Sequence, residues 1–184
     1  MDKAGTKQML RDTLLARRDG LPPAERRRLS GRIVARLTGD VRVRDATTVL
    51  SYQPFGSEVD VGAFNDWAVL HGKTLAFPFC HGAGIMEALV PSSIDALVKG
   101  RYGIVAPDPE RSRTIIPEAL DLILVPCVGF DEGLVRLGMG GGFYDRYLLQ
   151  CTKAVKLGVA FLSQKVPKVA REPWDAVLDE VVCA

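Results

Sequence analysis

The stretch between residues 121 and 148 constrains the fold of this chain more than any other. It begins with the apolar, partly β-branched run Leu122-Ile-Leu-Val-Pro126, which predicts a buried strand that ends at the proline. Four of the five residues from 138 to 142 are then glycine. The apolar residues after the glycines recur with the spacing of one helix face, at Tyr144, Tyr147, Leu148 and Cys151. A buried strand, a glycine-rich turn and a helix in this order are typical of an α/β domain.

The glycine-rich turn predicts a phosphate site. Each glycine costs about 1 kcal/mol relative to alanine in backbone entropy, so four together indicate that bare backbone is needed here. Converging amide groups followed by a helix N-terminus suit an anion. Arg136 just before the turn offers a cation for phosphate oxygens, and Asp145 just after it offers a carboxylate for a bound magnesium ion. A tight connection, with an acid favoured only by the helix dipole, stays open as the alternative.

This stretch resembles the signature of the 5-formyltetrahydrofolate cyclo-ligase family, also called methenyltetrahydrofolate synthetases. The residues that carry the resemblance are Leu124-Val-Pro-Cys-Val-Gly-Phe-Asp131 and Arg136-Leu-Gly-Met-Gly-Gly-Gly-Phe-Tyr-Asp-Arg146. The resemblance implies conversion of 5-formyltetrahydrofolate to 5,10-methenyltetrahydrofolate with ATP and Mg2+, releasing ADP and phosphate. In the mechanism assigned to the family, the formyl oxygen attacks the γ-phosphate, and N10 of the folate then closes on the activated carbon.

The resemblance also implies an ATP site made of two segments, because Lys7-Gln-Met-Leu-Arg11 matches an N-terminal run of the family. The implied ATP-binding residues are Lys7, Gln8, Met9, Leu10, Arg11, Arg136, Leu137, Gly138, Met139, Gly140, Gly141, Gly142, Phe143 and Tyr144. Without the resemblance, Lys7, Arg11 and Arg18 are a basic helix edge of the kind that usually faces solvent.

The implied catalytic residues are Arg136 and Asp145, and the implied magnesium ligands are Asp145 and Asp179. The implied folate contacts are Gln53, Glu58, Met139, Gly140, Gly141, Gly142 and Phe143. From the residues alone, Glu58 is better read as an ordinary loop acid and Asp179 as a polar edge before a strand.

The rest of the chain predicts one domain over residues 1–184, since this length is too short for two ordinary domains. We expect a Rossmann-like α/β fold in three layers, α/β/α, around a mostly parallel, mixed sheet. The expected helices cover residues 5–19, with Thr6 as the N-cap, 21–39 and 60–70. The expected strands cover residues 47–52, 73–78, 85–90, 121–126, 155–161 and 177–182. Residues 91–120 predict an irregular excursion with short helical pieces.

Charge and composition limit the partners. The net charge of +2 divides into +7 over residues 1–44 and −5 over the rest. No aromatic residue accompanies the N-terminal charges, so we expect no nucleic-acid partner. We also expect a monomeric, cytoplasmic protein with no membrane contact, whose partners are ATP and 5-formyltetrahydrofolate in monoglutamyl or polyglutamyl form. Four cysteines without a Cys-x-x-Cys pair argue against a zinc site.

Three alternatives stay open at this stage. The basic N-terminal segment suits a catalytically silent nucleotide- or RNA-binding relative of the same fold. A glycine-rich phosphate loop also occurs in sugar-phosphate isomerases. Cys127, Met139 and Trp174 depart from the residues usual in the family, which leaves a ligase acting on another formylated amine.

Overall fold

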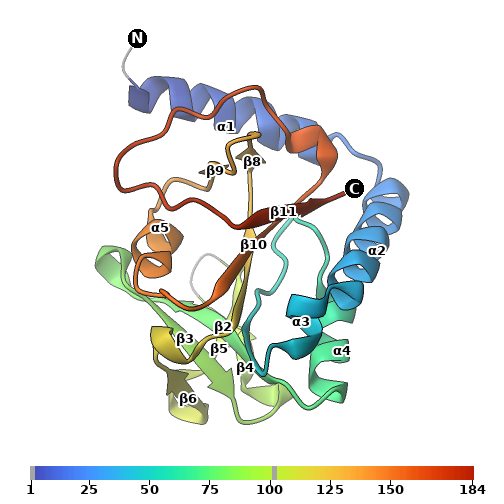
Figure 1. The fold of residues 1–184 in the computed structure, drawn as a ribbon, viewed down its shortest axis with the longest axis vertical. Helices are drawn as coiled ribbons and strands as arrows, with labels where there is room; N and C mark the ends of the chain where they lie inside the picture. The colour runs from blue at the N-terminus through green and yellow to red at the C-terminus, as the bar shows by residue number, and fades with distance from the viewer. Residues whose placement is uncertain (1–2, 101–102) are drawn as a thin grey trace.

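A seven-stranded sheet crosses the protein in the order β11-β10-β7-β1-β2-β3-β6 (Figure 1). The structure is a computed structural model and describes residues 3–100 and 103–184. The strands of this sheet are β1 (Thr48–Leu50), β2 (Thr74–Cys80), β3 (Met86–Pro91), β6 (Ser112–Ile115), β7 (Leu122–Pro126), β10 (Val155–Ala160) and β11 (Glu180–Cys183). All pairs from β11 to β2 are parallel, and β3 and β6 extend the sheet in antiparallel pairing. The mostly parallel, mixed sheet expected from the sequence is confirmed.

Strand β7 lies between β10 and β1 and is the most enclosed part of the sheet. Its residues Leu122–Val125 have no exposed surface, as expected for a parallel strand covered on both faces. Leu122 pairs with Val155 of β10, and Ile123 pairs with Leu50 of β1. The central strand therefore fixes the register of both neighbours and carries the chain to the loop that follows Pro126.

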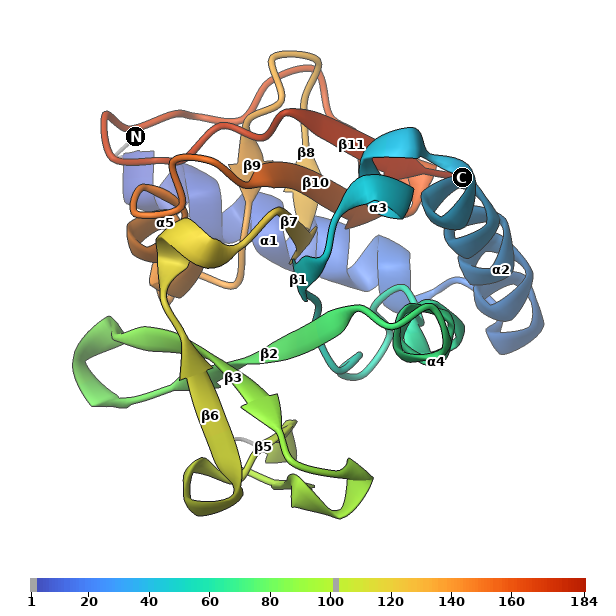
Figure 2. The same ribbon diagram turned by 60° about the horizontal axis from the view of Figure 1, so that its bottom comes forward.

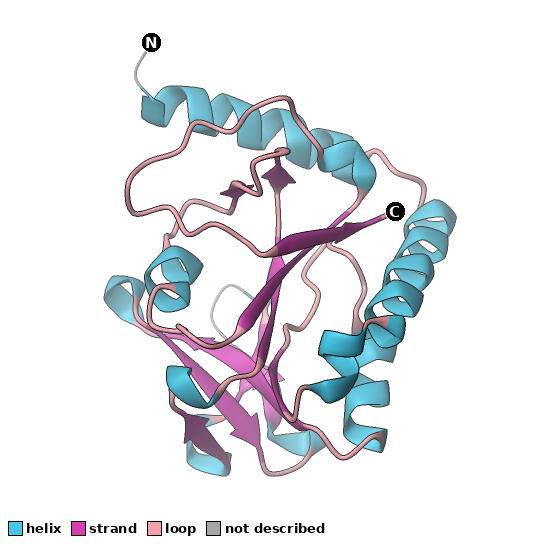
Figure 3. Cartoon of the chain, in the orientation of Figure 1, coloured by secondary structure: helices cyan, strands magenta, loops and turns pink. Residues whose placement is uncertain are grey.

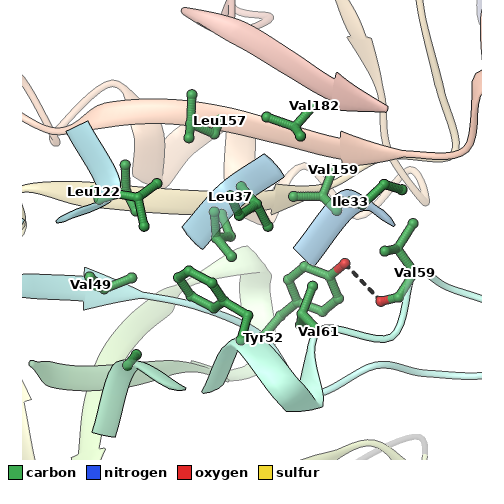
Figure 4. Close-up of a cluster of buried hydrophobic side chains, with 14 of the residues drawn as sticks. Ile33, Leu37, Val49, Tyr52, Val59, Val61, Leu122, Leu157, Val159 and Val182 are labelled. Carbon is green, nitrogen blue, oxygen red and sulfur yellow. Dashed lines mark hydrogen bonds between the residues drawn. The ribbon is translucent and has the colours of Figure 1, made fainter. Parts of the chain in front are cut away.

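Three helices cover one face of the sheet: α2 (Pro23–Gly39), α3 (Val41–Asp45) and α4 (Gly62–Leu70). Their apolar residues Ile33, Leu37 and Phe64 pack on the sheet residues Val49 and Leu157 (Figure 4). The apolar stripe of α2 predicted from its spacing is thus the main contact of this layer. The hydroxyl of Tyr52 donates to the carbonyl of Val59 at 3.0 Å and closes the core toward the loop before α4.

The opposite face carries a thinner layer. Its only helix among the described residues is the short α5 (Phe143–Leu148), which brings Tyr147 and Leu148 onto Ile123 and Val125 of β7. Figure 2 shows α5 on one side of the sheet and α2, α3 and α4 on the other. The three-layer arrangement is confirmed, with one layer supplied mostly by loops.

Helix α1 (Lys3–Asp19) lies across the loops at the carboxyl ends of the strands. Beneath it is the short hairpin of β8 (Gly129–Phe130) and β9 (Arg136–Leu137), which the sequence did not predict. Leu14 of α1 packs on Leu137 of β9 and on Val166 and Val169 of the C-terminal segment, which is residues 161–179 between β10 and β11. Figure 3 shows this segment as a long loop that passes α1 and returns to β11. Three distant parts of the chain therefore meet at one end of the sheet.

Two local predictions were wrong. Helix α1 begins before residue 5, at Lys3, so Thr6 lies inside the helix and is not its N-cap. Residues 91–120 contain short 3-10 turns as predicted, but also β4 (Leu97–Lys99), β5 (Val105–Pro107) and β6. Strand β6 extends the main sheet by pairing with β3, while β4 and β5 form a separate two-stranded sheet. Across residues 3–100 and 103–184, none of the helices has the length and apolar character needed to span a bilayer.

Candidate active site

A cavity of about 570 Å³ opens where α1, the loop 138–142 and the C-terminal segment meet. It is lined by Lys7, Arg11, Arg136, Leu137, Gly138, Met139, Gly140, Gly141, Gly142, Phe143, Asp145, Arg146, Leu149, Glu172, Trp174 and Asp175. The structure therefore brings together both segments that the resemblance assigned to ATP. Four basic and three acidic side chains face one another across this cavity, which suits an anionic ligand accompanied by a cation.

The glycines of the loop line the cavity, and two of them adopt backbone angles that other residues rarely adopt. Gly140 has a φ of +98° and Gly142 a φ of +66°. Gly142 is also the residue from which α5 begins. A Cβ atom at Gly140 would lie 3.3 Å from the guanidinium carbon of Arg11, so the absence of a side chain lets Arg11 approach the loop.

Arg11 fixes the glycine loop to α1. Its Nε donates to the carbonyl of Gly138 at 2.8 Å, and its Nη1 donates to the side-chain oxygen of Gln8 at 3.1 Å. Helix α1 is thus a wall of the cavity, and its basic edge is not the solvated surface that the residues alone suggested.

Arg136 is the most constrained cation of the cavity. It is only 7% exposed, and its Nη2 donates to Asp145 Oδ1 at 3.1 Å. The guanidinium carbon lies 5.4 Å from the ring centre of Tyr144. Its Nε and Nη1 are buried and have no hydrogen-bond partner among the described residues. A permanently charged group with two unused buried donors strongly favours an anionic acceptor such as a phosphate oxygen.

Lys7 enters the cavity from α1 between two carboxylates. Its Nζ donates to Asp175 Oδ2 at 2.6 Å and to Glu172 Oε2 at 2.9 Å. Burial would lower the pKa of Lys7, but the hydrogen bonds to Asp175 and Glu172 outweigh burial and raise this pKa above its usual value. Lys7 is therefore a fixed positive charge at neutral pH.

The residues present fit a magnesium ion that is shared with phosphates. Asp145 and Asp175 both line the cavity and offer the hard oxygen ligands that magnesium prefers. In the part of the chain that the structure describes, no three His, Cys, Asp or Glu side chains form a complete metal cage. Magnesium in nucleotide enzymes usually takes one or two carboxylates and completes its shell with phosphate and water, and this donor set matches that pattern.

The structure does not bring the predicted ligand Asp179 to this place. Its carboxylate accepts from the backbone N-H of Lys156 at 2.7 Å, and its own N-H donates to the Lys156 carbonyl at 3.0 Å. Lys156 lies at the beginning of β10, whereas the cavity lies beyond the carboxyl ends of the strands. Asp179 therefore supports the junction of β10 and β11, and Asp175 occupies the position expected of the second acid.

Four residues implied for ATP are absent from the cavity lining and lie elsewhere in the structure. Gln8 holds Arg11, Leu10 packs with the apolar cluster beneath α1, and Met9 is 64% exposed. Tyr144 lies under the guanidinium of Arg136, and burial is the main reason that its pKa is far above the usual value. Both implied segments therefore reach the cavity, but only some of their residues line it.

Gln53 and Glu58, the implied folate contacts after β1, are also absent from the lining of this cavity. The carboxylate of Glu58 accepts from the N-H of Phe55 at 3.0 Å. Burial raises the pKa of Glu58, while the Phe55 bond and the charge of Arg18 lower it by less. The charge of Glu58 in turn adds to the raised pKa of Tyr144, so it lies within electrostatic range of the layer behind Arg136.

A second cavity, of about 340 Å³, lies between α5, β3 and β6. Phe143 and Arg146 line both cavities. Arg146 donates to the carbonyls of Gly84 and Gly141, at 3.0 and 2.7 Å, and so ties the glycine loop to the turn between β2 and β3. A Cβ atom at Gly84, where φ is +77°, would collide with this guanidinium.

Sequence reasoning missed the five cavity residues Arg146, Leu149, Glu172, Trp174 and Asp175. The spacing of two acids in Glu172-Pro-Trp-Asp175 was a usable signal, because the intervening proline favours a turn that brings them together. The reciprocal bonds between them, Glu172 N-H to Asp175 Oδ2 at 2.8 Å and Asp175 N-H to the Glu172 carbonyl at 3.0 Å, form such a turn.

Comparison with known proteins identifies the family. The model of the 5-formyltetrahydrofolate cyclo-ligase family matches residues 3–184. The 5-formyltetrahydrofolate cyclo-ligase of Escherichia coli K12 is 34% identical over 171 residues, which cover 90% of this chain and 93% of that protein. The corresponding protein of Mycolicibacterium smegmatis is 29% identical over 182 residues, covering 96% of this chain and 93% of its own length.

Solved structures agree with the sequence matches. The NMR structure of Aquifex aeolicus 5,10-methenyltetrahydrofolate synthetase superposes with a TM-score of 0.85 at 33% identity, covering 96% of this chain and 89% of that one. A 5,10-methenyltetrahydrofolate synthetase from Mycoplasma pneumoniae superposes with a TM-score of 0.79 at 27% identity, covering 99% and 98%. With the family model, the curated relatives and the fold in agreement, the chain belongs to the 5-formyltetrahydrofolate cyclo-ligase family of enzymes.

Proposed function

We propose that this protein cyclises 5-formyltetrahydrofolate to 5,10-methenyltetrahydrofolate and cleaves ATP to ADP and phosphate in doing so. The observation that carries the proposal is the buried guanidinium of Arg136. Its Nε and Nη1 lack hydrogen-bond partners among the described residues, and Arg136 lines the cavity together with the glycine backbone. A phosphate oxygen is the acceptor that best satisfies such a group. Family membership supplies the folate part of the proposal.

The proposed reaction asks the protein mainly for alignment and charge neutralisation. The formyl oxygen attacks the γ-phosphorus and ADP leaves; N10 then attacks the formyl carbon, loses its proton, and phosphate leaves. Both nucleophiles belong to the substrate, so no serine or cysteine nucleophile is required. Lys7, Arg11 and Arg136 stabilise the negative charge that moves between the phosphoryl oxygens during the first step.

Asp145 and Asp175 are the residues that would hold magnesium, and a bound magnesium ion would neutralise charge on the transferring phosphates. Arg136 pairs with Asp145 and Lys7 pairs with Asp175 in the unliganded protein. Each cation therefore keeps one carboxylate oriented before the ligand arrives, which lowers the cost of ordering the site on binding.

The folate substrate lies on the side of Phe143 and the glycine loop in this proposal. Glu58 supports that orientation, because its carboxylate lies within electrostatic range of Tyr144 beneath the loop. Arg146 supports it as well, since it keeps the glycine loop and the β2–β3 turn in one arrangement.

The test is an absorbance assay for the methenyl product with 5-formyltetrahydrofolate, in which ATP and magnesium are supplied or withheld separately. We expect product only when both are present, with one ADP formed per product. Product formed without ATP would contradict the phosphoryl-transfer step. ADP formed at the same rate with another formylated amine, and not with the folate, would assign the protein a different substrate.

A further inference from the structure

Lys7 forms ion pairs with two carboxylates, although a single carboxylate would be enough to hold a cation at a phosphate site. Its Nζ contacts Asp175 at 2.6 Å and Glu172 at 2.9 Å. The side chain of Asp175 is 9% exposed and that of Glu172 is 30% exposed, so Glu172 is the outer partner. Since Asp175 is the carboxylate proposed for magnesium, one of the two partners of Lys7 becomes engaged elsewhere when the metal and nucleotide bind.

Glu172 differs from Asp175 in how it is placed. Both hydrogen bonds that Asp175 accepts among the described residues end on Oδ2, one from Lys7 and one from the N-H of Glu172. The N-H of Asp175 is held by the carbonyl of Glu172. Glu172 thus orients the Asp175 carboxylate through its backbone and contacts Lys7 through its side chain.

We propose that Glu172 is a positioning residue that retains Lys7 at the phosphate site while Asp175 engages the metal. This inference rests on the proposed ATP and magnesium chemistry. An ammonium group in a largely buried position is costly to leave without a charged or polar partner. With Glu172 present, Lys7 keeps an acceptor after Asp175 turns to the metal. Without Glu172, Lys7 stays hydrogen-bonded to Asp175 and competes with the metal for the same carboxylate oxygen.

The test compares nucleotide affinity with and without magnesium in the variant Glu172→Gln. Calorimetric titration with ADP, free of folate, gives the dissociation constant in excess magnesium and in excess chelator. We expect magnesium to strengthen ADP binding in the wild-type protein. In Glu172→Gln we expect this strengthening to fall about tenfold, while affinity in chelator stays within about twofold.

Two controls separate positioning from general stability. Glu132→Gln removes a carboxylate from another lysine pair, with Lys165 at 3.1 Å, which lies outside the cavity. We expect this variant to behave as wild type. In a Lys7→Ala background, adding Glu172→Gln should change the magnesium effect by less than about twofold, because the residue it positions is gone.

The possible results are distinct. An equal loss of ADP affinity with and without magnesium, or a full magnesium effect in Glu172→Gln, overturns the role of Glu172 and leaves the proposed function standing. A wild-type protein that binds ADP with no magnesium effect overturns the proposed function together with this inference. If Glu172→Gln unfolds, Glu172→Ala serves instead, with the same expected fall in the magnesium effect, and a full magnesium effect in that variant overturns the role.

Discussion

Replacing Arg136 by lysine is the sharpest test of the phosphate site, because it preserves the charge and removes the geometry. Arg136 uses Nη2 for Asp145 and leaves Nε and Nη1 buried, with no hydrogen-bond partner in the part of the chain that the structure describes. A lysine ammonium can reach Asp145, but it cannot present two further donors in a fixed plane. Each lost hydrogen bond to a charged acceptor is worth about 1.5–3 kcal/mol.

Loss of two such bonds amounts to about 3–6 kcal/mol, which corresponds to a fall in rate of somewhat over ~100-fold to about 25,000-fold. Because lysine keeps the positive charge, we expect the lower part of this range, about 100- to 1,000-fold in kcat/KM for ATP. The measurement is the initial rate of methenyl absorbance at varied ATP, with urea unfolding to confirm that Arg136→Lys is folded. Arg113→Lys, at an exposed position of β6 outside the cavity, is the matched control. A kcat/KM within about threefold of wild type in Arg136→Lys would refute the reasoning.

Three further predictions test other parts of the site. Lys7→Ala should raise the KM for ATP more than the KM for folate in steady-state kinetics, because Lys7 lines the cavity with the glycine loop; a defect confined to folate would contradict its assignment. Asp175→Asn should abolish the effect of magnesium on ADP affinity in calorimetric titration, whereas Asp179→Asn should keep it, because only Asp175 lines the cavity; the reverse result would restore Asp179 as the metal ligand. Glu58→Gln should stabilise the protein against urea more at pH 7 than at pH 4. Burial raises the pKa of Glu58 above 4.5, so its unfavourable contribution is absent below that pH and grows as pH rises through the folded pKa. An equal gain at both pH values would show that the Glu58 charge carries no such penalty.

The sequence predicted the parts of the site that lie close together along the chain. Arg136, the glycines and Asp145 lie within ten residues, so the order of a strand, a turn and a helix was enough to place them near one another. Lys7 and Arg11 were assigned through the resemblance, since nothing in their spacing distinguishes a cavity wall from a solvated helix edge. Their burial depends on the β8–β9 hairpin and on the C-terminal segment, and that packing is not local.

The acid expected to share the cavity with Asp145 was misplaced because the path of a loop cannot be read from composition. Val177 forms a bridge with Val135, and Leu178 donates to the carbonyl of Leu134 at 3.1 Å. The chain has therefore left the cavity by the time it reaches Asp179. Only these long-range backbone contacts decide that Asp175, four residues earlier, is the acid inside.

Six of the seven strands of the main sheet were predicted, and their ends differ from the predicted ends by up to three residues. The buried runs of β7 and β10 were recognised because both faces are apolar, which leaves a continuous signal in the sequence. Strand β6 was missed because Arg113 and Thr114 are exposed and polar, as is common at a sheet edge. The hairpin of β8 and β9 contributes only two residues to each strand, too few to produce a periodic pattern.

The ion pair between Lys7 and Asp175 joins residues that are 168 positions apart. During synthesis on the ribosome, the helix that carries Lys7 emerges long before the acid that completes its surroundings. A nascent chain can therefore assemble much of the sheet while this cavity is still incomplete. If the proposed function holds, a stalled chain that ends before residue 172 should be unable to retain ATP.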